Sequence, residues 1–153
     1  MTTVRPIRRS DVAAVVAMAE RFHAASPVYS VLPFSRRKVA EHVSWPFTHP
    51  HARAWFVAER DGDLIGAMGV RVVGANCSEA MIGLDDGFWV EPSARGALVG
   101  KRLVRECEAW AKAHGAVLMG CAITAGLDPE GRTARMFDLL GFGRGGTTHF
   151  KGL

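Results

Sequence analysis

The sequence predicts an α/β domain built around a mixed β-sheet. Two observations indicate this class: β-rich runs alternate with helical segments along the chain, and short turns join the early strands whereas helices separate the later ones. Strands joined by tight turns pair antiparallel, and strands connected through a helix pair parallel. We therefore expect a sheet of about six to seven strands flanked by about four helices.

The first part of the chain predicts one strand and two helices. Residues 2–7 alternate in polarity and are predicted to form an edge strand. Ser10 is a suitable N-cap for a helix over residues 10–25. Ser35 is a suitable cap for a second helix over residues 35–43.

An antiparallel region follows these helices. Residues 55–60 and 64–73 are β-rich and flank Asp61-Gly62, a dipeptide that favours a two-residue hairpin turn. Residues 79–90 are predicted to form the next strand.

In the last third of the chain, the sequence predicts two helices, each followed by a strand. Residues 96–114 carry one apolar stripe at helical spacing, and the all-apolar run 117–123 suits a central strand covered on both faces. Residues 132–140 are predicted to form a short helix, and residues 142–150 a last strand.

Length, charge and cysteine content narrow the class of protein. The 153 residues predict one domain spanning 1–153. No apolar run is long enough to span a bilayer and no signal-peptide pattern opens the chain, so we expect a cytoplasmic protein without a membrane partner. The net charge of +4 favours an anionic partner. The three cysteines lack ligand spacing, and we expect reduced thiols and no metal site.

An anion-binding cradle is predicted where the strand ending near Val90 passes through a glycine-containing turn into the helix from Gly96. The free N–H groups and the dipole of a helix N-terminus attract phosphate, and Arg95, Lys101 and Arg102 add full positive charges. The segment is neither a Walker A loop nor a GxGxxG fingerprint.

This segment resembles the signature of the GNAT superfamily of N-acetyltransferases, V-x-P-x-x-R-G-x-G-[IV]-G-x-x-L. The matching residues are Val90, Pro92, Arg95, Gly96, Val99, Gly100 and Leu103. Leu98 stands where the family has its first core glycine, a departure that removes flexibility but no N–H donor. Residues 132–142 resemble the family's terminal pattern, R-T-x-R-x-[FY]-E-x-L-G-F, and the order of elements fits the GNAT fold.

The resemblance implies transfer of an acetyl group from acetyl-CoA to a primary amine, of a small molecule or a protein, by direct attack in a ternary complex. It implies that CoA is held by the strand before the cradle, the cradle and the late helix. The residues concerned are Phe88, Trp89, Val90, Arg95, Gly96, Ala97, Leu98, Val99, Gly100, Lys101, Arg102, Arg132, Arg135 and Phe137.

The attacking amine must lose a proton, and Asp86 and Asp85 are the candidate general bases. Strand alternation places Asp86 on the face of Phe88 and Asp85 on the opposite face, so only one faces the cleft unless a bulge intervenes near Gly87. We favour Asp86, because the carboxylates of the family commonly share its face.

Residues 21–34 resemble GNAT proteins found in phage and prophage genomes, and this likeness makes His23, Ser26 and Tyr29 candidate acceptor contacts. Many family members use a tyrosine in the late helix to protonate the leaving thiolate, and Phe137 stands there.

Two alternatives to an active acetyltransferase stay open. One is an inactive or weakly active module that binds acyl-CoA, and the other is a GNAT-like enzyme acting on nucleic acid. The basic residues do not interleave with aromatic ones in a known nucleic-acid motif, which disfavours the second. The protein could also form a homodimer, with a second copy of the chain as its partner.

Overall fold

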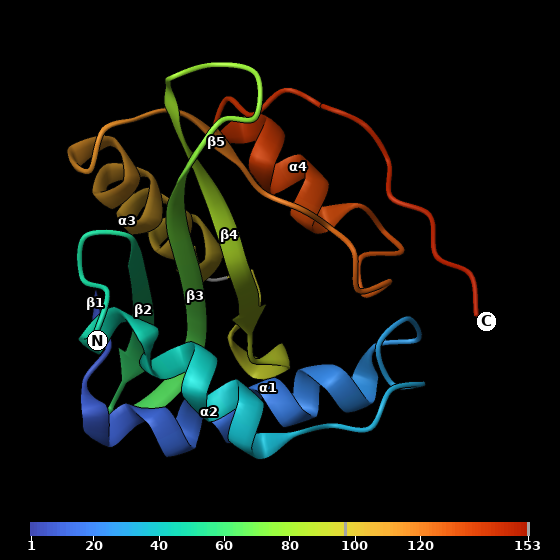
Figure 1. Ribbon diagram of the computed structural model, residues 1–153. Helices are drawn as coiled ribbons and strands as arrows, with labels where there is room; N and C mark the ends of the chain where they lie inside the picture. The colour runs from blue at the N-terminus through green and yellow to red at the C-terminus, as the bar shows by residue number, and fades with distance from the viewer. Residues whose placement is uncertain (97, 153) are drawn as a thin grey trace.

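The computed structural model describes residues 1–96 and 98–152 and contains one five-stranded sheet in the order β1-β2-β3-β4-β5 (Figure 1). Every neighbouring pair is antiparallel except β4 and β5, which are parallel. The strands are β1 (Thr2–Pro6), β2 (Arg53–Arg60), β3 (Asp63–Gly74), β4 (Met81–Val90) and β5 (Ala116–Gly120). The α-helices are α1 (Val12–Ala25), α2 (Arg36–Ser44), α3 (Val99–Ala113) and α4 (Arg132–Leu139).

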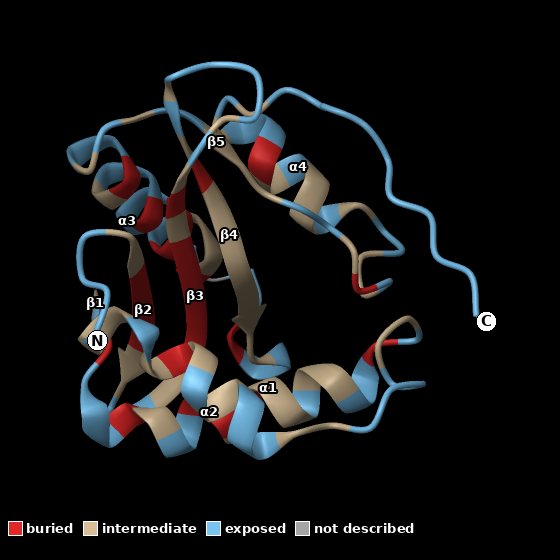
Figure 2. Cartoon of the chain, viewed as in Figure 1, coloured by how far each residue is buried: buried red, intermediate tan, exposed pale blue. Residues whose placement is uncertain are grey.

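Helices cover both faces of the sheet, with a separate apolar core on each (Figure 2). On one face, α3 and α4 pack against the sheet around Met68, Leu103 and Phe137. On the other face, α1 and α2 pack around Met18, Val43 and Val57. The predicted α/β class, mixed sheet and four helices are confirmed.

Local sequence signals account for several boundaries. Asp61 and Gly62 both have positive φ, 54° and 91°, which gives the β2–β3 hairpin the turn twist that matches its strands. The Ser35 hydroxyl accepts the Lys38 N–H at 3.3 Å and caps α2 as predicted. Ser10 does not cap α1, because the Asp11 carboxylate accepts the Arg8 N–H at 2.7 Å and α1 begins at Val12.

The C-terminal part of the sheet differs from the prediction. Residues 142–150 form no strand, and the segment after α4 runs as an extended trace (Figure 1). Three glycines within residues 143–146 leave little side-chain surface to pack there. Within the described residues the sheet therefore has five strands rather than six to seven.

As a consequence, β5 is an edge strand and not a buried central one. It ends at Gly120, short of the predicted residue 123, and pairs only with β4 among the described strands. The Val117 and Leu118 residues are 76% and 66% exposed. None of the helices in the described ranges is long and apolar enough to cross a bilayer.

Candidate functional site

A cleft of about 750 Å³ opens where β4 and β5 diverge. The two strands pair only as far as Leu84 and Gly120, so the second half of β4 has no neighbour on this side. The chain from Ala122 to Asp128 and the N-terminus of α3 form the other walls. The cleft has the size of a small-molecule site, and it extends from a helix N-terminus to a cluster of charged side chains.

A β-bulge in β4 shapes the deep end of this cleft. Gly87 pairs with Gly69, and Asp85 pairs with Val70, so Asp86 is an extra residue in β4. The bulge breaks the alternation, and both aspartates line the cleft. It also corrects the predicted faces: Phe88 packs in the α3–α4 core, whereas Asp86 contacts arginines of the α1–α2 face.

The Asp86 carboxylate is bound by two guanidinium groups. Arg53 Nη1 donates to Asp86 Oδ2 at 2.9 Å, and Arg71 Nη1 donates to Oδ1. The Asp86 side chain is only 2% exposed, and His42 Nε2 lies 4.0 Å from its Oδ2. Two adjacent positive charges favour the ionised carboxylate and occupy the oxygens that a base needs for accepting a proton. The favoured candidate base is therefore engaged in an ion-pair cluster.

Asp85 fastens the two walls of the cleft to each other. Its Oδ1 accepts the Ala122 N–H at 3.0 Å, which ties the chain after β5 to β4 just beyond their last paired residues. Burial raises the pKa of the Asp85 carboxyl, and the hydrogen bond from Ala122 opposes that rise.

An indole ring supports the bulge from the α1–α2 side. The Trp55 ring occupies the space above two glycines: a Cβ on Gly69 would lie 2.5 Å from Trp55 Cε2, and a Cβ on Gly87 would lie 3.1 Å from Trp55 Cη2. Only glycine at both positions lets this ring lie flat against β3 and β4 next to Asp86. The two residues thus have a packing role beside the bulge.

His42 stands beside this ring and was not identified from the sequence. Its imidazole is edge-on to Trp55, with ring centroids 6.0 Å apart, and its centroid lies 4.4 Å from that of Trp45, which follows α2. Burial, followed by the charges of Arg53 and Arg71, lowers the pKa of His42. Arg71 also lines the cleft and was missed. No local pattern marks these residues, because their partners come from other elements.

The other end of the cleft is the predicted anion cradle. Among the described residues, the α3 N-cap, Leu98, makes no side-chain capping bond, and the first turn holds no acidic residue. The Arg102 N–H makes the first intrahelical bond, to Leu98 O, which leaves the preceding helical N–H groups without intrahelical acceptors. Lys101 lies in the same turn, where a cation opposes the helix dipole. A bound anion would relieve that repulsion and accept hydrogen bonds from the free N–H groups.

The cleft brings most of the predicted residues together. It is lined by Tyr29, Asp85, Asp86, Phe88, Trp89, Val90, Arg95, Gly96, Leu98, Gly100, Lys101 and Arg132. Arg95 donates to Val90 O at 3.1 Å and lies over the Trp89 ring, whereas Arg132 pairs with Glu130 at 2.6 Å. Ala97 lies outside the described residues.

Several predicted residues do not line the cleft. Val99 belongs to the core, Arg102 donates to Thr2 O at 2.8 Å, and Phe137 is buried beside Phe88 and Phe142. Arg135, like these three, is absent from the cleft walls. His23 packs against Phe34 at a centroid distance of 5.1 Å.

Ser26 and Tyr29 join the loop after α1 to the chain after β5. Ser26 Oγ donates to Ala125 O at 2.6 Å, and the Tyr29 hydroxyl is 2.8 Å from Thr124 Oγ1. Tyr29 and Thr124 both line the cleft, so this pair of contacts closes it on the side away from β4.

Comparison with known proteins gives one family and a large set of similar folds. The family model described as acetyltransferase (GNAT) family matches residues 17–142. No curated protein sequence matches the chain. Similar solved structures include glucosamine-6-phosphate N-acetyltransferase from Arabidopsis thaliana, with TM-score 0.76, 13% identity and coverage of 99% of this chain and 98% of the other.

Two further structures have the same fold. One is a ribosomal-protein-alanine N-acetyltransferase from Brucella melitensis biovar Abortus 2308, with TM-score 0.74, 14% identity and 99% of each chain covered. The other is a predicted acetyltransferase with acetyl-CoA from Clostridium acetobutylicum, with TM-score 0.75, 14% identity and coverage of 100% of this chain and 96% of the other. At these identities the likeness establishes the fold alone.

We predict that Leu98→Gly stabilises the protein. Leu98 has φ 63° and is 63% exposed, so its side chain gains little from packing while its backbone is left-handed. Removing this strain is expected to raise the free energy of unfolding by about 1 kcal/mol, measured by denaturant unfolding. The control Leu118→Gly, at an exposed position of β5, is expected to lower it. A loss of stability in Leu98→Gly contradicts the assignment of strain.

We also predict that Asp86→Asn destabilises the fold. The substitution leaves Arg53 and Arg71 without their shared carboxylate, at an expected cost of roughly 2 kcal/mol. The control Glu41→Gln removes one partner of the exposed Arg37 pair and is expected to change stability by less than about 0.5 kcal/mol. Thermal unfolding of both variants measures the difference, and equal effects would mean that burial of Asp86 adds nothing.

Proposed function

The chain belongs to the acetyltransferase (GNAT) family, and we propose that it transfers an acetyl group from acetyl-CoA to a primary amine of a small molecule or a protein. The observation that carries the proposal is the cleft itself. It joins an uncapped helix N-terminus, suited to a pyrophosphate, to a polar cluster beside the bulge in β4. A cofactor with anionic and acyl ends fits such a site.

The residues around the cradle fit CoA in detail. The uncapped first turn of α3, together with Lys101, would bind the pyrophosphate. Gly100 lines the cleft in close contact with two side chains, since a Cβ there would lie 2.9 Å from Met136 Sδ and 3.1 Å from Phe88 Cζ. The unpaired edge of β4 offers backbone groups to the pantetheine arm. Bound acetyl-CoA supplies an activated thioester, which an amine attacks at the carbonyl carbon.

Direct attack fits the state of the cysteines near the cleft. Burial raises the pKa of Cys121 to about 12, so its thiol stays protonated at neutral pH. Cys107 is fully buried, and burial raises its pKa as well. Neither thiol is therefore suited to form an acyl-enzyme intermediate.

The acceptor amine would approach past Tyr29 and Arg71, which line the cleft together with the bulge in β4. We propose that Tyr29 contacts it, and that Ser26 acts through the loop it fastens. The similar structures include, by name, acetyltransferases for a sugar phosphate and for a ribosomal-protein alanine, and such different acceptors leave the acceptor of this chain open.

The alternative is a module that binds acyl-CoA without transfer. Phe137 favours it, because this residue has no hydroxyl and is buried away from the cleft. A role on nucleic acid has less support, since Arg36 pairs with Glu20 and Arg37 with Glu41. The likeness of residues 21–34 to phage-associated members, a homodimer and a cytoplasmic location remain predictions from the sequence.

We predict that acetyl-CoA binds the wild-type protein and that Lys101→Glu weakens binding about tenfold or more, because a negative charge then faces the pyrophosphate. Calorimetric titration measures both affinities. The matched control is Lys112→Glu, in the exposed last turn of the same helix, which makes the same change in net charge.

Equal weakening in both variants would mean that net charge and not the cradle governs binding. No binding to the wild-type protein would overturn the proposed function. Substitution of Gly100 is a poorer test, because the added Cβ would also push Met136 and Phe88, two other residues of the cleft wall, and a loss of binding would not isolate the cradle.

A further inference from the structure

Acetyl transfer to an amine requires a group that accepts a proton. At neutral pH an alkylamine is an ammonium ion without a lone pair, so it cannot attack a carbonyl carbon. A base at the acceptor end must remove one proton, directly or through one water molecule. Among the described cleft residues at that end, the titratable candidates are His42, Asp85 and Asp86, with Tyr29 beside them.

The aspartates already have other partners in the fold. Asp86 is bound by Arg53 and Arg71, and losing its charge would leave two guanidinium groups without a counter-charge. Asp85 accepts the Ala122 N–H across the divergence of β4 and β5. Its other carboxylate oxygen makes no hydrogen bond within the described residues, so Asp85 is the main rival.

His42 occupies a built position next to the bulge. The imidazole packs between the Trp45 and Trp55 rings, and Trp55 itself lies against the glycine pair that flanks Asp86. Its Nε2 faces the Asp86 carboxylate at 4.0 Å, while part of the side chain, 31%, stays exposed at the cleft wall. The ring is therefore packed against two indoles and still reaches the cleft, where a ligand can meet it.

The surroundings of His42 keep it neutral. The charged groups that face it from the neighbouring strands are Arg53 on β2, Arg71 on β3 and Asp86 on β4. Burial, and after it the charges of Arg53 and Arg71, lowers the pKa of the imidazole. A neutral imidazole has the lone pair that the reaction needs at neutral pH.

We propose that His42 is the general base that removes a proton from the acceptor ammonium; this rests on the proposed acetyl transfer. The ammonium gives one proton to the imidazole, and the freed lone pair forms the C–N bond to the thioester carbon. The C–S bond then breaks, the nitrogen loses its second proton to the departing thiolate, and the imidazolium releases its proton to water. The products are the amide, CoA thiol and one proton.

The test compares two simple amines on wild type and His42→Gln. Benzylamine is protonated at neutral pH and needs a base, whereas 2,2,2-trifluoroethylamine is already unprotonated there. We expect His42→Gln to lower kcat/KM for benzylamine about 100-fold and for trifluoroethylamine by less than about threefold. Thiol release and the mass of the acetylated amine are measured, and affinity for acetyl-CoA stays unchanged.

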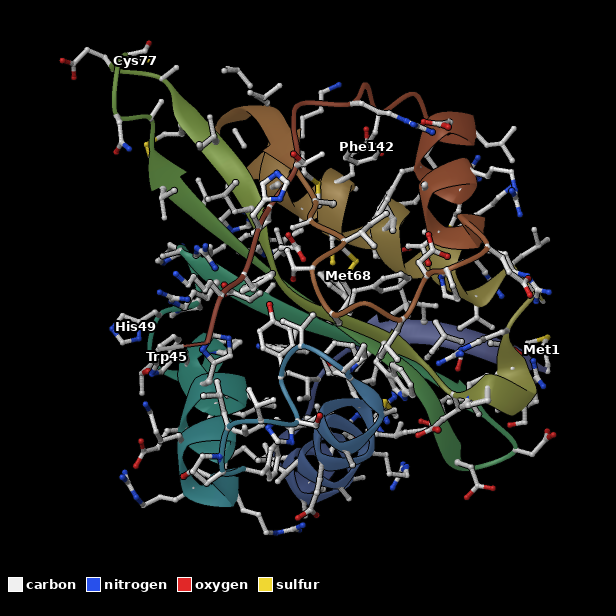
Figure 3. The ribbon with its side chains drawn as sticks, turned by 90° about the vertical axis from the view of Figure 1, so that its right-hand side faces the viewer. Met1, Trp45, His49, Met68, Cys77 and Phe142 are labelled. Carbon is white, nitrogen blue, oxygen red and sulfur yellow. The ribbon has the colours of Figure 1, made fainter. Side chains whose placement is uncertain are left out.

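The controls separate a base from a structural support. His49→Gln changes an exposed histidine of the loop before β2 (Figure 3) and is expected to leave both rates unchanged. Equal losses with both amines in His42→Gln would mean that His42 only shapes the site, and would overturn the proposal. A selective loss of benzylamine turnover in Asp85→Asn, with His42→Gln unaffected, would assign the base to Asp85.

A second measurement does not depend on turnover. We expect acetyl-CoA to shift the NMR resonances of the His42 ring and not those of His49, because the acyl end reaches the bulge. Acetyl-CoA bound without any shift at His42 would overturn the assignment of His42 while leaving the cofactor site intact. Absence of both binding and turnover would instead overturn the proposed function.

Discussion

One extra residue in β4, Asp86, determines the geometry on which the cleft depends. The bulge at this residue changes the register of β4 against β3, and one to two residues earlier β4 loses its pairing with β5. The unpaired backbone beyond that point would be costly in a closed interior, because buried N–H and C=O groups need partners. In an open cleft those groups are available to a ligand, and this requirement explains why the strands diverge around a site.

The bulge is held by contacts from three other elements, β2, β3 and α2. Arg53 on β2 and Arg71 on β3 bind its carboxylate, His42 on α2 faces it, and Trp55 covers the adjacent glycines Gly69 and Gly87. A carboxylate this deeply buried is tolerated only with such compensation. The same arrangement removes Asp86 as a free base and leaves a neutral imidazole beside it, so the support of the bulge and the proposed proton transfer arise from one cluster.

The net positive charge of the chain matters less than where its individual charges lie. Many arginines are paired within the fold, as Arg5 is with Asp11 and Glu59. The charges at the start of α3 are different, because Lys101 opposes the helix dipole and no acidic side chain compensates it there. The place of the charges along the chain, and not the net charge, therefore points to the predicted anion-binding end of the cleft. Leu98 has a left-handed backbone conformation directly before the helix begins there.

The sequence by itself determined the features that depend on neighbours along the chain. The Asp61-Gly62 turn, the Ser35 cap and the strand–turn–helix segment are local and form where the pattern predicts them, and the helix predicted over residues 96–114 is observed over 99–113. The family signature around Arg95 and Gly100 is equally local, which is why the family and its fold could be predicted from it.

Tertiary structure alone decided which side chains from different strands and helices lie next to one another. One inserted residue exchanges the two faces of a strand, so the position of Asp86 depended on a register that alternation could not give. The exposure of β5 depended on whether residues 142–150 form a strand beside it, and their glycines prevented it. His42, Arg53 and Arg71 come from three elements without a shared motif. Their proximity follows from packing, and packing is set by long-range contacts that no local spacing records.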